Sequence, residues 1–125
     1  MKNRIQLSAG DSFLSLTFTL RDRFVARPGF RLDPYDPSSM LPVDLDKIET
    51  VTVSIRKRQA VLDPAIHVQA IRLRPRDAGV CVLPWTPDTF ATPGVYEGEI
   101  TLTDAVGAVE TVVEKLVFEV RERLT

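Results

Sequence analysis

The sequence predicts an all-β protein, an immunoglobulin-like antiparallel β-sandwich of about seven strands, and three observations support this fold class. Residues that favour strands are abundant, because the 125 residues include 15 valines, 6 isoleucines and 11 threonines. They occur in short runs in which apolar and polar residues alternate, which is typical of strands with one buried face. Proline, glycine and aspartate separate these runs at intervals of roughly 10–20 residues, as in a sandwich. The length corresponds to one domain, residues 1–125, and a small β-barrel is the alternative arrangement of the same strands.

The first three predicted strands show the alternation most clearly. They span Phe13–Leu20, Thr50–Lys57 and Ile66–Leu73. In the third strand the apolar positions change phase after Ala70, which predicts a β-bulge there, because one extra residue reverses the side-chain parity. The side chains expected to face the core are Leu14, Leu16, Phe18 and Leu20 in the first strand, Val51, Val53 and Ile55 in the second, and Ile66, Val68 and Ala70 in the third.

The C-terminal half supplies the remaining strands. Val80–Trp85 is a short apolar run, and Val95–Thr103 alternates again before a turn at Asp104–Gly107. Residues 108–124 are compatible with either a strand or a helix, since their valines and leucines also fit a helical stripe at steps of three and four. The β-branched residues and the short preceding turn favour a strand, with a bulge near Val113.

Residues 21–46 form a long insertion between the first two of these strands. Four prolines interrupt it, and no period persists through it. A connection of this length in a compact domain is usually functional or disordered. Aromatic and basic side chains are frequent in it, so we expect a partner-binding loop whose contacts are made by Phe24, Arg27, Phe30, Arg31, Tyr35 and Met40.

The composition argues against catalysis, metal binding and nucleic-acid binding. The net charge is −1, whereas nucleic-acid-binding domains are usually basic. A single cysteine, Cys81, excludes an internal disulfide and a multi-cysteine zinc site. Cys81 and the single histidine, His67, are one conceivable nucleophile–base pair, but the valines on both sides of Cys81 favour a buried thiol. No glycine-rich phosphate loop or serine-nucleophile motif is present, so we expect no enzyme, no catalytic residue, no metal and no cofactor.

Three groups of charged residues admit a functional interpretation, although we favour a structural or solvated role for each. Glu97 and Glu99 share one strand face, as the paired carboxylates of a glycosidase do. Three alternating arginines offer a stripe for phosphates, for an acidic partner or for solvent: Arg72, Arg74 and Arg76. Four aspartates of the insertion offer oxygen ligands for calcium but occur mostly in turn contexts: Asp33, Asp36, Asp44 and Asp46.

Three blocks of the sequence carry a family resemblance. They are GDSFLSLTFTLRD (Gly10–Asp22), PVDLDKIETVTVSIRKR (Pro42–Arg58), and the segment Val82–Val120 with its Trp and its ATPGVY turn. In this order they resemble the immunoglobulin-like domain at the N-terminus of phage baseplate upper proteins (BppU-like) and related tail-associated phage proteins. The insertion at Arg21–Pro42 departs from that family, in which the corresponding connection is usually a short hairpin.

The resemblance implies a non-enzymatic structural component of a tailed-phage virion, made in the host cytoplasm, that docks on other phage structural proteins. The symmetry of such a particle implies several copies. Family members often continue into a stalk or receptor-binding region, whereas this sequence stops at Thr125, so attachment or assembly is the expected role. The longest apolar runs have four residues or fewer, so we expect neither a signal peptide nor a membrane as partner.

Two alternatives to a baseplate protein remain open at this stage. A capsid decoration or neck protein is the alternative within the same class. A carbohydrate-binding β-sandwich is the alternative from another class, and it predicts that Trp85 or Tyr35 is exposed to solvent. We expect instead that Trp85 and Tyr96 fill the core of the sandwich.

Overall fold

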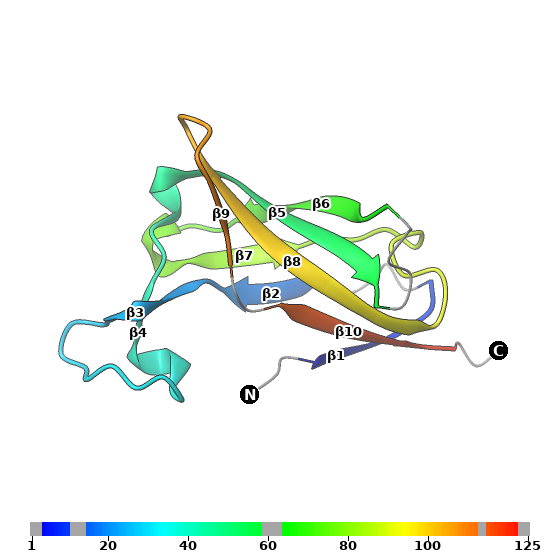
Figure 1. Cartoon of the computed structure of the whole chain (residues 1–125), viewed down its shortest axis with the longest axis horizontal. Coiled ribbons are helices and arrows are strands. Elements are labelled where there is room, and N and C mark those ends of the chain that lie inside the picture. The colour runs from blue at the N-terminus through cyan, green and yellow to red at the C-terminus, as the bar shows by residue number, and fades with distance from the viewer. Residues whose placement is uncertain (1–3, 11–14, 59–63, 113–114, 123–125) are drawn as a thin grey trace.

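The computed structural model describes residues 4–10, 15–58, 64–112 and 115–122, and it confirms the all-β fold (Figure 1). The described residues form ten strands and three short 3₁₀ turns. The strands are β1 (Arg4–Ser8), β2 (Leu16–Thr19), β3 (Arg21–Ala26), β4 (Met40–Pro42), β5 (Ile48–Lys57), β6 (Ile66–Arg72), β7 (Val80–Leu83), β8 (Gly94–Asp104), β9 (Val109–Thr111) and β10 (Leu116–Arg121).

Strand β6 connects the two layers of the sandwich. The hydrogen-bonded order is β1-β10-β8-β5-β6-β7-β2, with β9 also paired to β8. The part of β6 that ends at Ala70 pairs with β5, whereas Ile71 and Arg72 pair with β7. The change of apolar phase that the sequence places after Ala70 therefore marks the point where the strand leaves one layer for the other. Ile71 is exposed at this crossing rather than buried, and Ile66, which the sequence analysis expected to face the core, is also exposed at the start of the strand.

The strand order is that of an immunoglobulin-like fold. Strands β5, β8 and β10 take the places of strands C, F and G in one sheet, and β2 and β7 those of B and E in the other. Near the start of β8, the Tyr96 hydroxyl donates a hydrogen bond to the main-chain carbonyl of Thr92 at 2.8 Å. This bond to a carbonyl four residues upstream is the tyrosine corner of immunoglobulin-like sandwiches.

The sequence analysis did not predict strand β1, and this strand departs from the antiparallel pairing expected for the sandwich. It pairs in parallel with β10 over five residues, from Arg4↔Val117 to Ser8↔Arg121. Its apolar residues are too few for a periodic signal, because only Ile5 and Leu7 alternate with polar neighbours. The strand is held by pairing along an existing edge and by the burial of Leu7 in the core.

Phe90 lies at the centre of an aromatic cluster in the core. Its ring makes edge-on contacts with Trp85 and Tyr96, at centroid distances of 5.6 and 5.3 Å, and a tilted contact with Phe118 at 4.7 Å. Trp85 and Tyr96 are buried, as predicted. The inward side chains predicted for β5 are also confirmed, because Val51, Val53 and Ile55 are at most 1% exposed. Leu16 and Phe18 pack partly buried against this core, and Leu20 is fully part of it.

The C-terminal segment is a strand, as the β-branched residues predicted. It is interrupted, because β9 pairs with Thr101–Thr103 and β10 with Gly94–Gly98 of the same strand β8. Four residues, 112–115, lie between the two pieces, whereas only Glu99 and Ile100 lie between their partners on β8. The extra residues break the register; the bulge predicted at Val113 itself falls outside the described residues.

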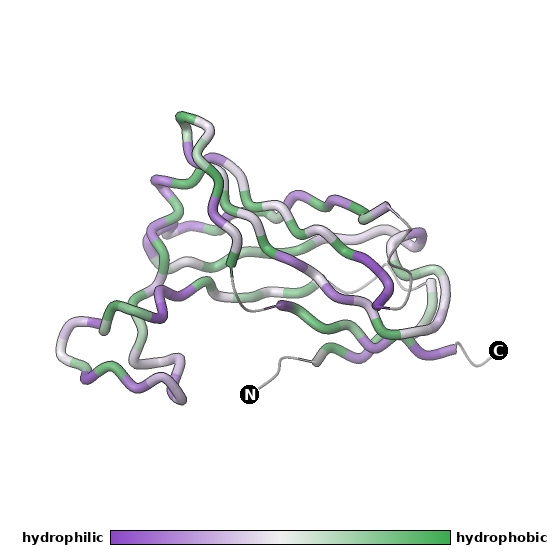
Figure 2. Tube along the Cα trace, in the orientation of Figure 1, coloured by the Kyte–Doolittle hydropathy of each residue, from purple (hydrophilic) through white to green (hydrophobic). Residues whose placement is uncertain are grey.

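The insertion contains regular structure that the sequence analysis did not predict. Strands β3 and β4 form a two-stranded antiparallel ribbon that projects from one end of the sandwich (Figure 1). We call residues 21–42 the hairpin. Its strands escape a search for periodicity because they are short, and because their pairing shifts register between Asp22 and Ala26. Along the hairpin, hydrophobic and hydrophilic residues intermix in sequence (Figure 2).

Candidate functional site

The two ends of the hairpin meet at its base, where three main-chain segments converge. The Leu20 amide donates to the Gly79 carbonyl at 2.8 Å, and the Val43 amide donates to the Leu20 carbonyl at 2.9 Å. Gly79 has a φ of +71°, and its hydrogen faces Leu20 and Val43 so closely that a Cβ would lie 2.5 Å from the Leu20 oxygen. The hairpin therefore leaves the sandwich and returns to it at one point.

A wide bulge in β3 displays Phe24. Asp22 pairs with Leu41 and Ala26 pairs with Met40, so residues 23–25 have no paired residue on β4. The Asp22 carboxylate accepts a hydrogen bond from the Phe24 amide at 2.9 Å, which fixes the bulge locally. As a result, the Phe24 side chain is 82% exposed.

The far part of the hairpin is held by side chains that cap turns. Asp33 accepts from the Tyr35 amide at 2.9 Å, and Asp36 accepts from the Ser38 amide at 3.0 Å. The hydrogen bonds from Ser38 hold the pKa of the Asp36 carboxyl below its usual range. Ser39 is buried and donates to the Asp36 carbonyl at 2.7 Å. These aspartates serve the turns, as their sequence context predicted, and the loop has a defined shape without a hydrophobic core.

Two aromatic residues beyond Phe24 stand out from this part of the hairpin. Tyr35 is 94% exposed and Phe30 is 50% exposed. The guanidinium of Arg27 lies over the Phe30 ring at 5.6 Å, and that of Arg23 lies over the Phe24 ring at 5.9 Å. Such cation–π contacts orient the rings and leave one face of each for another molecule. Arg31 is exposed and Arg27 half-buried, so both lie within reach of a partner.

Met40 corrects the prediction for this surface. The sequence analysis expected it among the contact residues, but it is only 8% exposed. Met40 begins β4, and its carbonyl accepts a hydrogen bond from the Arg21 guanidinium at 3.4 Å. Its side chain faces a groove between the hairpin and the sandwich instead of the outer surface. The exposed surface therefore consists of Phe24, Arg27, Phe30, Arg31 and Tyr35.

Sequence reasoning missed that groove entirely. It has a volume of about 330 Å³ and is lined by residues of β2, of the hairpin, of β8 and of the interrupted C-terminal strand. Phe18 and Leu116 each fit a buried strand face in the sequence, whereas Met40 was expected on the outer contact surface. Only the three-dimensional fold brings these segments together around a cavity.

The other candidate residues do not assemble into a reactive site. Cys81 is fully buried in β7, and burial raises the pKa of its thiol to about 11. His67 is exposed on β6, where its Nδ1 is 2.8 Å from the hydroxyl of Ser54. Glu97 accepts a hydrogen bond from Arg58 at 2.8 Å and lies 3.6 Å from Lys115, so it forms surface ion pairs. Arg58 lowers the pKa of the Glu97 carboxyl, whereas a glycosidase acid needs a raised pKa.

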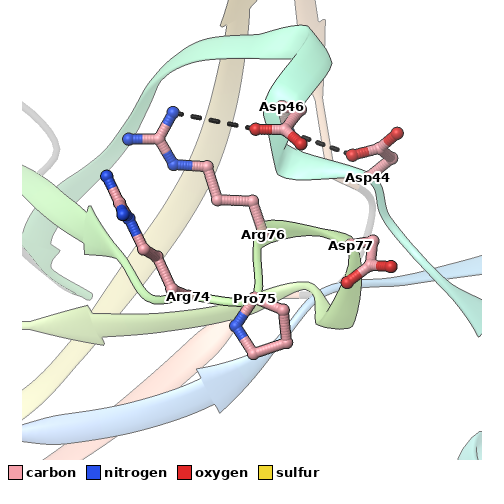
Figure 3. Close-up of a pocket in the computed structure, with 6 residues that line it drawn as sticks. All are labelled: Asp44, Asp46, Arg74, Pro75, Arg76 and Asp77. Atoms are coloured by element: carbon pink, nitrogen blue, oxygen red, sulfur yellow. Dashed lines mark hydrogen bonds and ion pairs between the residues drawn. The ribbon is translucent and has the colours of Figure 1, made fainter.

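Two of the three alternating arginines, Arg74 and Arg76, line a charged depression beside the base of the hairpin (Figure 3). Arg76 lies 3.8 Å from the Asp46 carboxylate, which belongs to the 3₁₀ turn Leu45–Lys47. Arg72 donates to the Leu45 carbonyl at 3.2 Å and also contacts the Ile48 carbonyl. Arg76 and Arg72 therefore both hold the segment that leads into β5. Asp44, Asp46 and Asp77 also line the depression. No three metal-ligating side chains among the residues described are placed so that they could hold a metal ion together.

Comparisons with known proteins give no further identification. The chain matches no family model and no curated protein. Among solved structures it is similar to one described as the solution structure of the PKD domain from KIAA 1837 protein. The identity is 15%, over 99% of this chain and 83% of that chain, and the TM-score of 0.29 is too low to support any argument. Within the described part of the chain, no helix is long and apolar enough to cross a membrane.

Proposed function

We propose that this protein is a non-enzymatic docking module, a structural component of a tailed-phage particle that binds neighbouring subunits through the hairpin. The single observation that carries the docking role is the exposure of Phe24, Phe30 and Tyr35 on a loop whose turns and base are fixed by hydrogen bonds. The assignment to a phage particle is supported by the resemblance of three sequence blocks to baseplate upper proteins.

The energetics of docking favour such a surface. An aromatic ring covered by a partner is a common anchor of protein interfaces, particularly beside arginine. Tyr35 and Phe30 have few rotatable bonds, and the turn that holds Tyr35 is capped by Asp33 at 2.9 Å. Little conformational entropy is then lost on binding, so a larger part of the contact energy appears as affinity.

Assembly of particles with altered hairpins tests this function. The double variant Phe30→Ala and Tyr35→Ala removes two exposed rings, so we expect the purified protein to keep its urea midpoint while its incorporation into particles is lost. Immunoblotting of purified particles measures the incorporation. The matched control is Val106→Ala with Val109→Ala, which removes exposed apolar side chains from the β8–β9 turn and should leave incorporation unchanged. Normal incorporation of the aromatic double variant would disprove docking through the hairpin.

The carbohydrate-binding alternative now depends on Tyr35 alone, because Trp85 is buried in the core. Titration of the protein with a panel of soluble glycans, followed through the NMR signals of residues near Tyr35, tests for carbohydrate binding. Binding that disappears in Tyr35→Ala would favour a lectin over a docking module.

A further inference from the structure

We propose that the groove beneath the hairpin binds an extended acidic segment of a partner protein, which adds a strand to the free edge of β2. This inference deepens the proposed docking function and rests on it, since it gives the chemistry of one partner. It uses the inner side of the hairpin, where Tyr35 also lines the groove, whereas the exposed Phe24 and Phe30 lie outside the groove lining.

Strand β2 offers unpaired main-chain groups on one side. It is the last strand of the sheet path among the described residues and pairs only with β7 on its other side. The Leu20 amide donates to the Gly79 carbonyl, in register with the pairing of β2 and β7. Since hydrogen-bonded positions alternate in an antiparallel pair, the main-chain groups of Phe18 also face β7. Those of Thr17 and Thr19 therefore face outward, and Thr19 lines the groove.

The floor of the groove is apolar and large enough for side chains of an added strand. Buried or half-buried side chains from four segments line it, among them Phe18, Met40, Ile100 and Leu116. Its volume of about 330 Å³ lies at the lower end of the range of binding pockets. Every second side chain of an added strand would point towards this floor, because side chains alternate along a strand.

The rim of the groove is positively charged. Arg21, Arg23 and Lys115 line it, and among the residues that the structure describes no carboxylate does. Two carboxylates that interact with these cations also have other partners: Glu97 is bonded to Arg58 at 2.8 Å as well as to Lys115, and Asp36, whose pKa Arg21 also lowers, accepts two hydrogen bonds from Ser38. Charge complementarity therefore favours an occupant with acidic side chains. Together, the free edge, the apolar floor and the cationic rim fit a strand in which apolar and acidic residues alternate.

Selection from a library of random ten-residue peptides on the purified full chain tests the proposal without any phage partner. The proposal predicts enriched peptides that alternate Asp or Glu with apolar residues. When the best of them is titrated, the NMR signals of Thr17, Thr19 and Lys115 should shift. N-methylation of alternate peptide amides should lower the affinity at least tenfold in one register and leave it unchanged in the other, because only one edge of the peptide meets β2.

Charge reversal on the protein supplies the second arm of the test. Lys115→Glu should weaken peptide binding at least tenfold, whereas the matched variant Lys47→Glu, an exposed lysine outside the groove, should not. Several results would overturn the proposal: no enriched peptides, enriched peptides without acidic residues, NMR shifts confined to other surfaces, or equal tolerance of N-methylation in both registers. Because these measurements need no particle, their failure is separate from failure of the incorporation experiment with Phe30 and Tyr35.

Discussion

Replacement of Gly79 by alanine tests how the hairpin is joined to the sandwich. A Cβ at this position would lie 2.5 Å from the Leu20 carbonyl oxygen and 3.1 Å from the Val43 nitrogen. These two main-chain atoms are hydrogen-bonded to each other at 2.9 Å, so they cannot move away from the new methyl group independently. The left-handed conformation costs an alanine about 1–2 kcal/mol. Overpacking against fixed atoms adds about 1–3 kcal/mol. We therefore expect Gly79→Ala to lower the free energy of unfolding by about 3 kcal/mol.

The control for this variant is Gly107→Ala in the β8–β9 turn. Gly107 also has a positive φ, +89°, but no atom lies within 4 Å of the site where its Cβ would be. It should therefore lose only the conformational part, about 1–2 kcal/mol. Urea unfolding followed by the fluorescence of the buried Trp85 measures both variants. Equal losses in the two variants would refute the account in which close main-chain approach at Gly79 joins the hairpin to the sandwich.

Three further predictions concern the core and the hairpin. Tyr96→Phe keeps the aromatic contacts but removes the hydrogen bond to the Thr92 carbonyl, so the free energy of unfolding should fall by about 1 kcal/mol; an unchanged urea midpoint would show that the tyrosine corner contributes nothing here. Because burial raises the pKa of the Cys81 thiol from 9.0 to about 11, the unfolded state ionises first and stability should fall as the pH rises from about 9 to about 11. Urea midpoints across this range should fall less steeply for Cys81→Ala than for the native protein, and equal slopes would contradict the burial of the thiol. Excision of residues 21–42, with Leu20 joined to Val43 through Asn-Gly, should leave a folded sandwich, since the two ends are already bonded at 2.9 Å; loss of the dispersed NMR spectrum would contradict this.

Most strands of the sandwich were predictable because they carry their own signal, which β1 lacks. Val51, Val53 and Ile55 alternate with polar residues, and the same period that identifies the strand also identifies its buried face. The phase change after Ala70 was also visible in the sequence. Its cause, a strand shared between two layers, depends on pairing with β5 and β7, which one segment cannot encode alone.

The hairpin and the groove were less accessible to sequence reasoning. Prolines and turn aspartates identify the hairpin as irregular, yet its shape depends on single hydrogen bonds such as that of the Phe24 amide to Asp22. Phe30 and Tyr35 were identified by residue type, and they are exposed. Met40 was misplaced by the same reasoning, because residue type does not show whether an apolar side chain in an insertion faces outward or back towards the sandwich.

The docking role of the hairpin is tested most directly by photo-crosslinking within particles. A benzoylphenylalanine in place of Tyr35, the most exposed aromatic residue among those that the structure describes, should form a covalent adduct with a different structural protein of the particle. The same group in place of Ile66, the exposed first residue of β6, should not, because β6 begins at the end of the sandwich away from the hairpin (Figure 1). Adducts from position 35 alone are the result we predict. Adducts from position 66 alone, or from neither position, would contradict docking through the hairpin.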